Sequence, residues 1–153
     1  MEQLITKFYT AFKNLDAQAM VSCYHENIEF EDPAFGKLYG EHAKNMWWML
    51  CQNAKELEVE FSKIKVNNNK GSAHWEVHYI FSQTGKKVYN SIDATFEFKD
   101  GLILKHTDNF NLHKWAKQAL GFKGLLIGGT SFFKKKLQQQ TSKLLSKFEQ
   151  KNT

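Results

Sequence analysis

The sequence lacks several residue types on which common protein classes depend. All 21 basic residues are lysine, so there is no arginine, and the chain has one proline and only two cysteines, Cys23 and Cys51. Arginine is the usual side chain for bidentate recognition of phosphate and guanine, so its absence argues against a nucleic-acid reader, and we expect no nucleic-acid partner. Two cysteines in a chain of 153 residues do not make a disulfide framework.

Long apolar segments are missing as well. The longest apolar stretch, LLIGG at residues 125–129, is far too short to span a bilayer. The N-terminal stretch MEQLITKFYTAF carries an acid at position 2 and no long apolar core, which is unlike a signal peptide. Because cysteines are few as well, we expect a cytoplasmic protein in a reducing setting.

The residues that are present indicate a folded globular domain with a basic tail. Apolar residues make up 42% and aromatic residues 14% of the chain, and the length is that of one domain with a sizeable core. The net charge of +5 comes from residues 130–153, which hold six lysines and one glutamate. Residues 1–129 hold 15 lysines and 15 acidic residues, so the domain itself is neutral.

The hydrophobic pattern predicts helices, then strands, then a helix. Apolar residues recur at helical spacing in residues 2–14 and 41–54, and Asp16 is a suitable N-cap for a second short helix that runs to about Tyr24. The period then changes to two, which predicts a meander of strands separated by turns. The predicted strands cover residues 27–32, 57–61, 72–81, 88–98 and 102–112. This order favours an α+β fold in which a curved antiparallel sheet wraps around a helix and leaves an apolar pocket between them.

The last predicted strand carries two ionisable residues on its apolar face. Leu102, Leu104, His106 and Asp108 share that face, whereas Ile103 falls on the other. His106 and Asp108 would lie roughly 7 Å apart, which suits two groups that touch one small ligand better than a direct pair. Two interpretations remain open: the two residues contribute to a pocket, or each satisfies a neighbouring donor in the core.

Parity also sorts the side chains of the two preceding strands. Trp75, Tyr79 and Asn90 point inward, while Asp93 falls on the outer face and Ala94 on the inner one. Two histidines of the 72–81 strand lie on its outer face, toward solvent or a second subunit: His74 and His78.

A short acidic and aromatic stretch contains the only proline. In FEDPAF, residues 30–35, Glu31 and Asp32 stand between Phe30 and Phe35. Asp-Pro can simply start a turn. A carboxylate beside aromatic rings can also be a proton-transfer group whose pKa is raised by desolvation. The sequence leaves both interpretations of Asp32 open.

Two stretches carry a family resemblance: FYTAFKNLDAQAMVSCYHENIEFEDPAFGKLYGEHA (residues 8–43) and VYNSIDATFEFKDGLILKHTDNF (residues 88–110). Over residues 2–112 the chain resembles the nuclear transport factor 2-like superfamily, in its SnoaL-like and ketosteroid isomerase-like branch. The resemblance implies a cone-shaped, cystatin-like α+β fold, with a pocket for a small apolar molecule inside the cone and a homodimer formed through the outer sheet face. We accordingly expect a SnoaL-like single domain at residues 1–120, followed at 121–153 by a glycine-containing loop and a basic C-terminal helix packed on that domain.

The ketosteroid isomerase pattern is matched only in part. That enzyme has its general base in an acid-Asp-Pro turn, which matches Asp32. Its oxyanion hole requires a tyrosine on the first helix, where this chain has Phe8, with Tyr9 one residue away. The hole also requires a strand aspartate, and that position falls on Asp93 without a gap or on Ala94 when the apolar faces are matched. Because parity favours Ala94, the resemblance predicts that the isomerase oxyanion hole is missing.

Other members of the superfamily point to the last strand. SnoaL-like cyclases keep an acid–base aspartate there, where Asp108 is the nearest match and His106 its partner. Limonene-epoxide hydrolases need an Asp-Arg-Asp arrangement that a chain without arginine does not supply. We therefore expect isomerase, cyclase or lyase chemistry on a small apolar carbonyl compound, without a cofactor, with Asp108, His106 and Asp32 as catalytic candidates. The pocket-lining candidates are Phe8, Tyr24, Trp75, Tyr79, Asn90 and Phe110.

Several alternatives stay open. The same cone can hold a hydrophobic ligand or a protein partner without catalysis. His106, Asp108 and Asp32 can form a facial set of metal ligands, although their spacing carries no metal signal. Residues 132–148 predict an amphipathic helix that packs on the domain or a dimer mate, or else contacts a membrane surface, since Phe132-Phe133 precedes three lysines. The glycines in residues 124–130 permit a mobile flap near the pocket.

Overall fold

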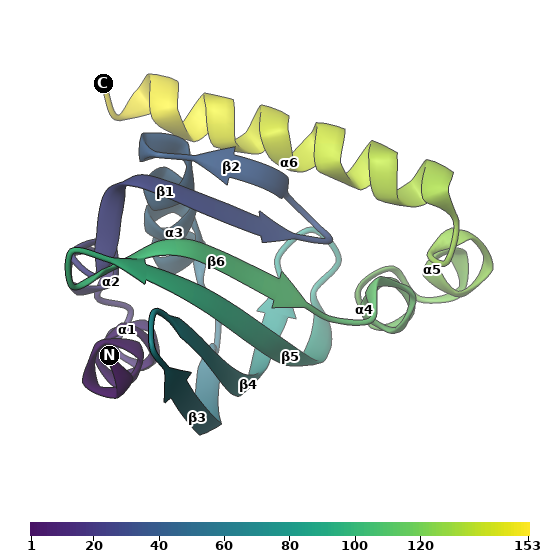
Figure 1. Ribbon diagram of the computed structural model, residues 1–153. Coiled ribbons are helices and arrows are strands. Elements are labelled where there is room, and N and C mark those ends of the chain that lie inside the picture. Colours follow the sequence, from purple (N-terminus) through teal and green to yellow (C-terminus); the bar gives the residue numbers. More distant parts are fainter.

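The chain opens with helices that pack against one face of a curved sheet (Figure 1). The computed structural model describes residues 1–153, and these helices are α1 (Glu2–Lys13), α2 (Ala17–Val21) and α3 (Glu41–Asn53). Asp16 caps α2 by accepting a hydrogen bond from the Ala19 amide at 2.9 Å, which confirms the predicted N-cap. The predicted amphipathic helix is confirmed as well, since the buried residues of α1 recur at helical spacing: Ile5, Phe8, Tyr9 and Phe12.

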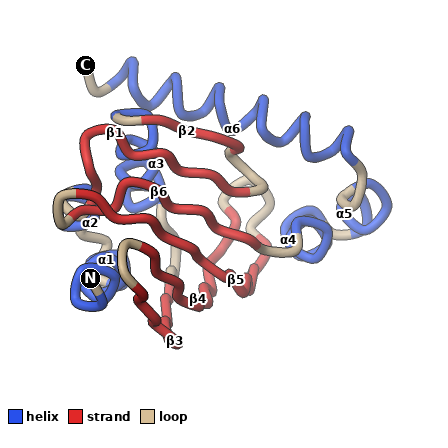
Figure 2. The backbone as a smooth tube through the Cα atoms, in the orientation of Figure 1, coloured by secondary structure: helices blue, strands red, loops and turns tan.

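The six strands form one sheet with the order β2-β1-β6-β5-β4-β3 (Figure 2). They are β1 (Tyr24–Asp32), β2 (Gly36–Tyr39), β3 (Glu58–Asn67), β4 (Lys70–Phe81), β5 (Lys86–Lys99) and β6 (Leu102–Asn109). The predicted antiparallel meander is confirmed from β3 to β6. β1 joins β6 in parallel, so the sheet is not antiparallel throughout. β2, which the spacing does not predict, returns along β1 after the Asp-Pro turn, where Gly36 has a φ of 72°.

Strand parity is confirmed for β5 and interrupted once in β6. Ala94 is buried and pairs with Asp108, whereas the Asp93 side chain is 83% exposed on the outer face. In β6 the register shifts by one residue, because Phe98 pairs with Ile103 but Glu97 pairs with Lys105. This bulge turns Ile103 inward, where it is fully buried, so its predicted outward position is wrong.

The inner face of the sheet and the three helices enclose a main core of 26 buried residues. A second, smaller core lies where β4 and β5 meet the C-terminal helices, and it is made by Val88, Trp115, Ala116, Ala119 and Phe133. Tyr79 and Phe110 pack against both cores. The C-terminal segment is therefore continuous with the packing of the domain.

Three helices follow the sheet: α4 (Leu112–Leu120), α5 (Phe122–Ile127) and α6 (Ser131–Lys151). α5 occupies most of the segment for which a loop was expected. It can pack so closely because Gly124 and Gly128 face α4, where a Cβ on Gly124 would lie 1.9 Å from the Ala116 carbonyl oxygen. No helix is long and apolar enough to cross a membrane.

The long helix α6 runs beside β2 and the turn that joins it to β1 (Figure 1). The Gln138 amide donates to the Pro33 carbonyl at 3.2 Å, and the Thr141 hydroxyl donates to the Ala34 carbonyl at 2.9 Å. Further along, Leu145 is buried in the main core. Glu149 accepts hydrogen bonds from side chains of α3, at 2.8 Å from His42 and 3.1 Å from Asn45. The C-terminal helix is thus tied to the turn that contains Asp32.

Candidate functional site

His106 is the polar residue at the centre of the main core, with 0% of its surface exposed. Aromatic rings from α1, β1, α3 and β5 surround the imidazole, with centroids 4.6–6.1 Å away. They belong to Phe8, Tyr24, Phe30, Trp47 and Phe96. Such a wall excludes water, so the two ring nitrogens depend on side chains of the core for hydrogen bonds.

A chain of hydrogen bonds runs through this imidazole. The Tyr24 hydroxyl lies 2.7 Å from His106 Nδ1, and His106 Nε2 lies 3.0 Å from Asp108 Oδ1. Trp47 Nε1 donates to the Tyr24 oxygen at 2.8 Å, and Trp75 Nε1 donates to Asp108 Oδ1 at 3.2 Å. We call these five residues the His106 network. It joins α3 to β1, β4 and β6 through the middle of the core.

Two directions in the network are fixed by chemistry, because an indole N–H can only donate: Trp47 donates to Tyr24 and Trp75 donates to Asp108. The Tyr24 oxygen accepts from Trp47, and the same hydroxyl group is paired with His106 Nδ1. His106 Nε2 is paired with Asp108 Oδ1. Both ring nitrogens of His106 therefore have hydrogen-bond partners.

The structure corrects the expected separation of His106 and Asp108. The two side chains lean toward each other along β6 and bond directly, so they do not flank a ligand. The enclosed imidazole has no surface to offer to a ligand. Asp108 is 3% exposed, and its Oδ1 accepts both network bonds while Oδ2 makes no hydrogen bond within the protein. Within the network, Oδ2 is therefore the atom with unused hydrogen-bonding capacity.

Tyr9 is a polar core residue that the sequence analysis did not include among the site candidates. Its hydroxyl is the only buried side-chain polar atom without a hydrogen-bond partner. Burial raises the pKa of Tyr9 well above its ordinary value, and the charges of Asp108 and Tyr24 raise it further. The helical spacing of α1, which places Tyr9 beside Phe8 on the buried face, was the available signal. An unpaired buried hydroxyl of this kind requires an explanation.

Asp32 lies at the end of β1, outside the His106 network. Its Oδ1 accepts hydrogen bonds from the Ala34 and Phe35 amides at 2.9 and 2.6 Å, so the side chain closes the turn. Burial nevertheless raises the pKa of Asp32 to about 7; the two amides oppose this rise, and the charges of Asp108 and Glu31 add to it. Its Oδ2 makes no hydrogen bond within the protein. The two interpretations of FEDPAF thus describe one residue, a turn former whose carboxyl group changes protonation near neutral pH.

Tyr79 connects Asp32 to the C-terminal helices. Trp115 Nε1 of α4 donates to the Tyr79 hydroxyl at 2.7 Å, and the hydroxyl proton of Tyr79 has no acceptor in the protein. Burial raises the pKa of Tyr79, the Trp115 hydrogen bond opposes the rise, and the charge of Asp32 adds to it. Asp32 and Tyr79 share no hydrogen bond, but each carries unused hydrogen-bonding capacity and the charge of Asp32 acts on Tyr79.

The other predicted site residues are dispersed. Phe8 is fully buried and stacks on Tyr24 with ring centroids 5.3 Å apart. Asn90 and Phe110 are partly buried, and the Asn90 side chain makes no hydrogen bond. The structure thus brings together His106, Asp108, Tyr24 and Trp75, whereas Asp32 and Tyr79 lie outside this group and make no contact with each other through a hydrogen bond.

No group of three or more His, Cys, Asp or Glu side chains is arranged to hold a metal ion. The facial set of His106, Asp108 and Asp32 is therefore not formed. The reason is geometric: His106 directs its two nitrogens to Tyr24 and Asp108, and Asp32 directs one oxygen to its own turn.

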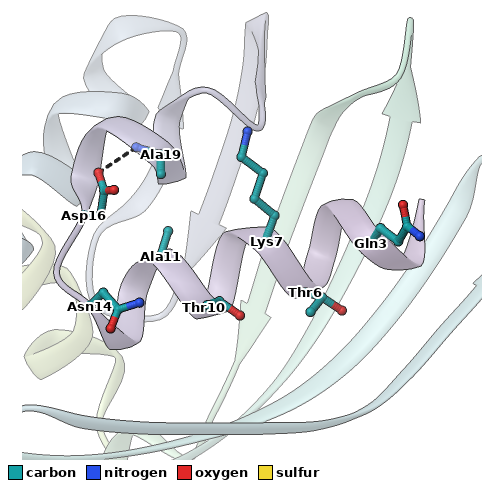
Figure 3. Close-up of a pocket in the computed structure, with 8 residues that line it drawn as sticks. All are labelled: Gln3, Thr6, Lys7, Thr10, Ala11, Asn14, Asp16 and Ala19. Atoms are coloured by element: carbon teal, nitrogen blue, oxygen red, sulfur yellow. Dashed lines mark hydrogen bonds between the residues drawn. The ribbon is translucent and has the colours of Figure 1, made fainter.

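Two surface hollows lie outside the cone. One, of about 430 Å³, lies along α1 and α2 and is lined by polar side chains such as Lys7, Asn14 and Asp16 (Figure 3). The other, of about 420 Å³, lies beside α4 on the outer side of β3 to β5 and includes His78, Tyr89 and Gln118. Neither hollow is lined by Asp32, His106 or Asp108, but the second is lined in part by Tyr79, a predicted pocket-lining residue.

The outer sheet face is polar. His74 Nδ1 lies 2.8 Å from Asp93 Oδ1, and the Tyr89 hydroxyl donates to Glu76. The His78 side chain is exposed and its ring packs on Tyr89, with centroids 4.7 Å apart. The predicted outward position of both histidines is confirmed, while a homodimer through this face stays a prediction.

Comparison with known proteins places the fold in a family. A family model described as a SnoaL-like domain matches residues 5–106, which is two thirds of the chain. No curated protein matches the chain.

Among solved structures, an epoxide hydrolase-like protein of Mycobacterium tuberculosis has a TM-score of 0.65 at 19% identity, covering 81% of this chain and 90% of its own. A proposed polyketide cyclase of Xanthomonas campestris has a TM-score of 0.64 at 21% identity, covering 76% and 94%. A protein of Catenulispora acidiphila with a ketosteroid isomerase-like fold, in complex with trimethylamine, has a TM-score of 0.67 at 12% identity, covering 76% and 91%. At these identities the similarity establishes the fold alone.

Proposed function

The chain belongs to the SnoaL-like domain family, and from that premise we propose that it binds a small, largely apolar carbonyl compound and transfers a proton on it, as an isomerase or cyclase does. The observation that carries the proposal is the Asp32 carboxyl group, whose pKa of about 7 lies near physiological pH. A general base is most effective when its pKa lies close to the pH at which it works. Proposed polyketide cyclases among the proteins of similar fold support the cyclase type.

Asp32 and Tyr79 have separate roles in the proposed reaction. Asp32 Oδ2, which has no partner in the protein, removes a proton from the carbon next to the carbonyl group. The electron pair moves onto the carbonyl oxygen, which accepts a hydrogen bond from the Tyr79 hydroxyl, and Tyr79 keeps its proton throughout. Asp32 then returns the proton to a different carbon, which completes an isomerisation. Tyr79 takes the place of the isomerase oxyanion hole, whose positions hold Phe8 and Ala94 in this chain.

In this proposal the roles of the predicted catalytic residues change. Asp108 acts through its charge, which raises the pKa of Asp32. His106 is a positioning residue, because it holds Asp108 without touching the ligand. The proposed reacting carboxyl group is therefore Asp32 of the Asp-Pro turn, and not Asp108 of the last strand.

Proton exchange in D₂O tests this function without knowledge of the substrate. A panel of apolar ketones and β-dicarbonyl compounds is incubated with the protein, and deuterium at the carbon next to the carbonyl is followed by NMR. We expect exchange with at least one compound, at a rate that rises with pH up to about 7 and then levels off. Asp32→Asn should lower the rate at least about a hundredfold and Tyr79→Phe about tenfold or more. Exchange that persists in Asp32→Asn, or that is lost equally in the outer-face variant Asp93→Asn, would exclude Asp32 as the base.

A non-catalytic binding module is the second candidate, and the filled interior favours it. The inner face of the cone is packed with aromatic rings around His106, and the two hollows described above lie on the outside. Titration with the same panel, followed by tryptophan fluorescence, separates the two functions, since Trp75 and Trp115 lie beside the two polar groups. Binding without deuterium exchange supports the module, whereas binding with exchange supports the enzyme.

A further inference from the structure

An ordinary surface helix buries its large apolar side chains, whereas α5 exposes them and buries its glycines. Its glycines, Gly124 and Gly128, are buried against Ala116 of α4. Its large apolar side chains point to solvent instead, with Phe122 74%, Leu125 42% and Leu126 64% exposed. Their spacing of three and four residues places them on one side of the helix. Solvent-facing Phe and Leu at this density need a partner, because single domains rarely expose contiguous apolar patches.

The start of α6 extends this apolar surface. Phe132 is 67% exposed, whereas its neighbour Phe133 is buried in the second core. We call Phe122, Leu125, Leu126 and Phe132 the α5 patch. Figure 1 shows α5 and the first turn of α6 at the same end of the molecule, remote from α1.

The position of the α5 patch is fixed by the fold. His113 Nε2 of α4 hydrogen-bonds the Leu125 carbonyl at 2.8 Å, and its imidazole also packs against Gly129. Thr130 caps α6 by accepting a hydrogen bond from the Phe133 amide at 3.1 Å. Both ends of the segment are therefore anchored, and exposure of the patch is a property of the folded state.

The segment that carries the patch has charge of one sign only. Residues 109–148 contain eight lysines and no aspartate or glutamate. All eight are exposed: Lys114, Lys117, Lys123, Lys134, Lys135, Lys136, Lys143 and Lys147. Lys136 Nζ lies 5.8 Å from the centre of the Phe132 ring, so charge and apolar surface are in contact. A partner of this surface has to combine negative charge with an apolar layer into which side chains can insert.

From this combination we infer that the α5 patch docks the protein on an anionic membrane surface, with Phe122, Leu125, Leu126 and Phe132 inserted among the lipid chains and the lysines at the phosphate level. A bilayer with anionic headgroups supplies both properties over an extended plane. Lysine suits this task, because a long flexible point charge finds a phosphate without fixed geometry. A second copy of the chain fits less well, since a symmetric contact would bring two basic surfaces together.

Vesicle co-sedimentation tests the inference. The whole chain is mixed with vesicles of phosphatidylcholine alone or of phosphatidylcholine and phosphatidylglycerol in equal parts. We expect binding only to the anionic vesicles, with a partition coefficient that falls as salt is raised. Phe122→Ser with Leu126→Ser should lower that coefficient at least about tenfold, and so should Lys134→Gln with Lys135→Gln and Lys136→Gln.

Matched controls separate this effect from general hydrophobicity and charge. Leu144→Ser removes another exposed leucine of α6, which is 44% exposed, and Lys63→Gln with Lys65→Gln and Lys70→Gln removes three exposed lysines of β3 and β4. Both controls should stay within about twofold of the unmodified protein. Circular dichroism melting confirms that each variant is folded. Equal binding to neutral vesicles, equal losses in the controls, or no binding to anionic vesicles would overturn the inference. A dimer that dissociates in Phe122→Ser with Leu126→Ser, seen by analytical ultracentrifugation without vesicle binding, would assign the patch to a second copy.

Discussion

The His106 network and the Asp32 turn are two polar regions of one molecule with opposite properties. In the network each proton has an acceptor, and the imidazole has no contact with solvent. At the turn, Asp32 Oδ2 and the Tyr79 proton have no partner, and the pKa of the carboxyl group is about 7. A satisfied buried network stabilises and orients, whereas an unsatisfied group at its edge remains available for a reaction. The more deeply buried residue is therefore the less reactive one.

The largest effect is expected from breaking the network at its centre. His106→Ala leaves a cavity among five aromatic rings and removes the partners of Tyr24 and Asp108, so we expect a loss of about 3–5 kcal/mol in the free energy of unfolding. Urea denaturation measures this loss. The exposed His78→Ala should stay within about 0.5 kcal/mol of the unmodified protein. A loss below about 1 kcal/mol in His106→Ala would mean that the network does not stabilise the core.

At the Asp32 turn we expect a substitution to raise the free energy of unfolding instead of lowering it. The pKa of Asp32 is 3.8 without the fold and about 7 within it, so the folded chain retains a proton that the unfolded chain has released. Stability therefore falls as pH rises through this window, and above it the full cost of the buried charge is present. Asp32→Asn keeps the acceptor of the turn without the charge, and it should raise the free energy of unfolding by about 2–4 kcal/mol above about pH 8.

Urea denaturation across pH checks this prediction. The gain in Asp32→Asn should disappear toward about pH 3, where Asp32 is protonated in the folded state and largely so in the unfolded one. Asp93→Asn, on the exposed outer face, should change stability by no more than about 0.5 kcal/mol. A gain that does not depend on pH would contradict the raised pKa.

Two tyrosines allow a satisfied and an unsatisfied hydroxyl group to be compared inside the core. Tyr24→Phe leaves Trp47 Nε1 and His106 Nδ1 without partners, so it should cost about 1–3 kcal/mol. Tyr9→Phe removes a hydroxyl that has no partner, so it should be neutral or stabilising by up to about 1 kcal/mol. Thermal melting of both variants measures these changes in stability. A cost above about 1 kcal/mol for Tyr9→Phe would show that a bound water or ligand satisfies Tyr9.

The smallest effect is expected from loosening α6. Gln138→Ala removes the hydrogen bond to the Pro33 carbonyl and should cost about 0.5–1.5 kcal/mol. Because it admits water to the turn, it should also move the pKa of Asp32 down toward its ordinary value. NMR titration of the labelled carboxyl carbon follows that pKa directly. Gln139→Ala, at the next and exposed position, is the control and should change neither quantity. An unchanged Asp32 pKa in Gln138→Ala would mean that α6 does not shield the turn.

Local patterns predicted the parts of the fold that depend on neighbours in sequence. The α1 periodicity, the Asp16 cap and the outward position of Asp93 all follow from residues within one element. β2 was missed because GKLY is too short to show alternation. α5 was missed because its glycines imply a loop until α4 is present to receive them.

The sequence predicted several residues of the candidate site but not the contacts between them. His106 and Asp108 were identified because they interrupt an apolar face, but strand rise does not say in which direction side chains lean, so their direct bond was not foreseen. Tyr9 was passed over because its missing partner is visible only in three dimensions. The contact of Gln138 with Pro33 joins residues 105 positions apart, a separation that no local pattern encodes.

That separation has a consequence for synthesis of the protein. Helix α6 is synthesised after all six strands of the sheet, and its Gln138 and Thr141 side chains bond the carbonyl groups of Pro33 and Ala34, next to Asp32. Until then these two hydrogen bonds are missing, and we expect the turn to be more open to water and the pKa of its carboxyl group to be lower. Domains are built from the N-terminus onward during translation. We therefore expect the raised pKa of Asp32 to appear only after α6 has docked on the turn, and a chain cut before residue 131 should carry Asp32 with a lower pKa.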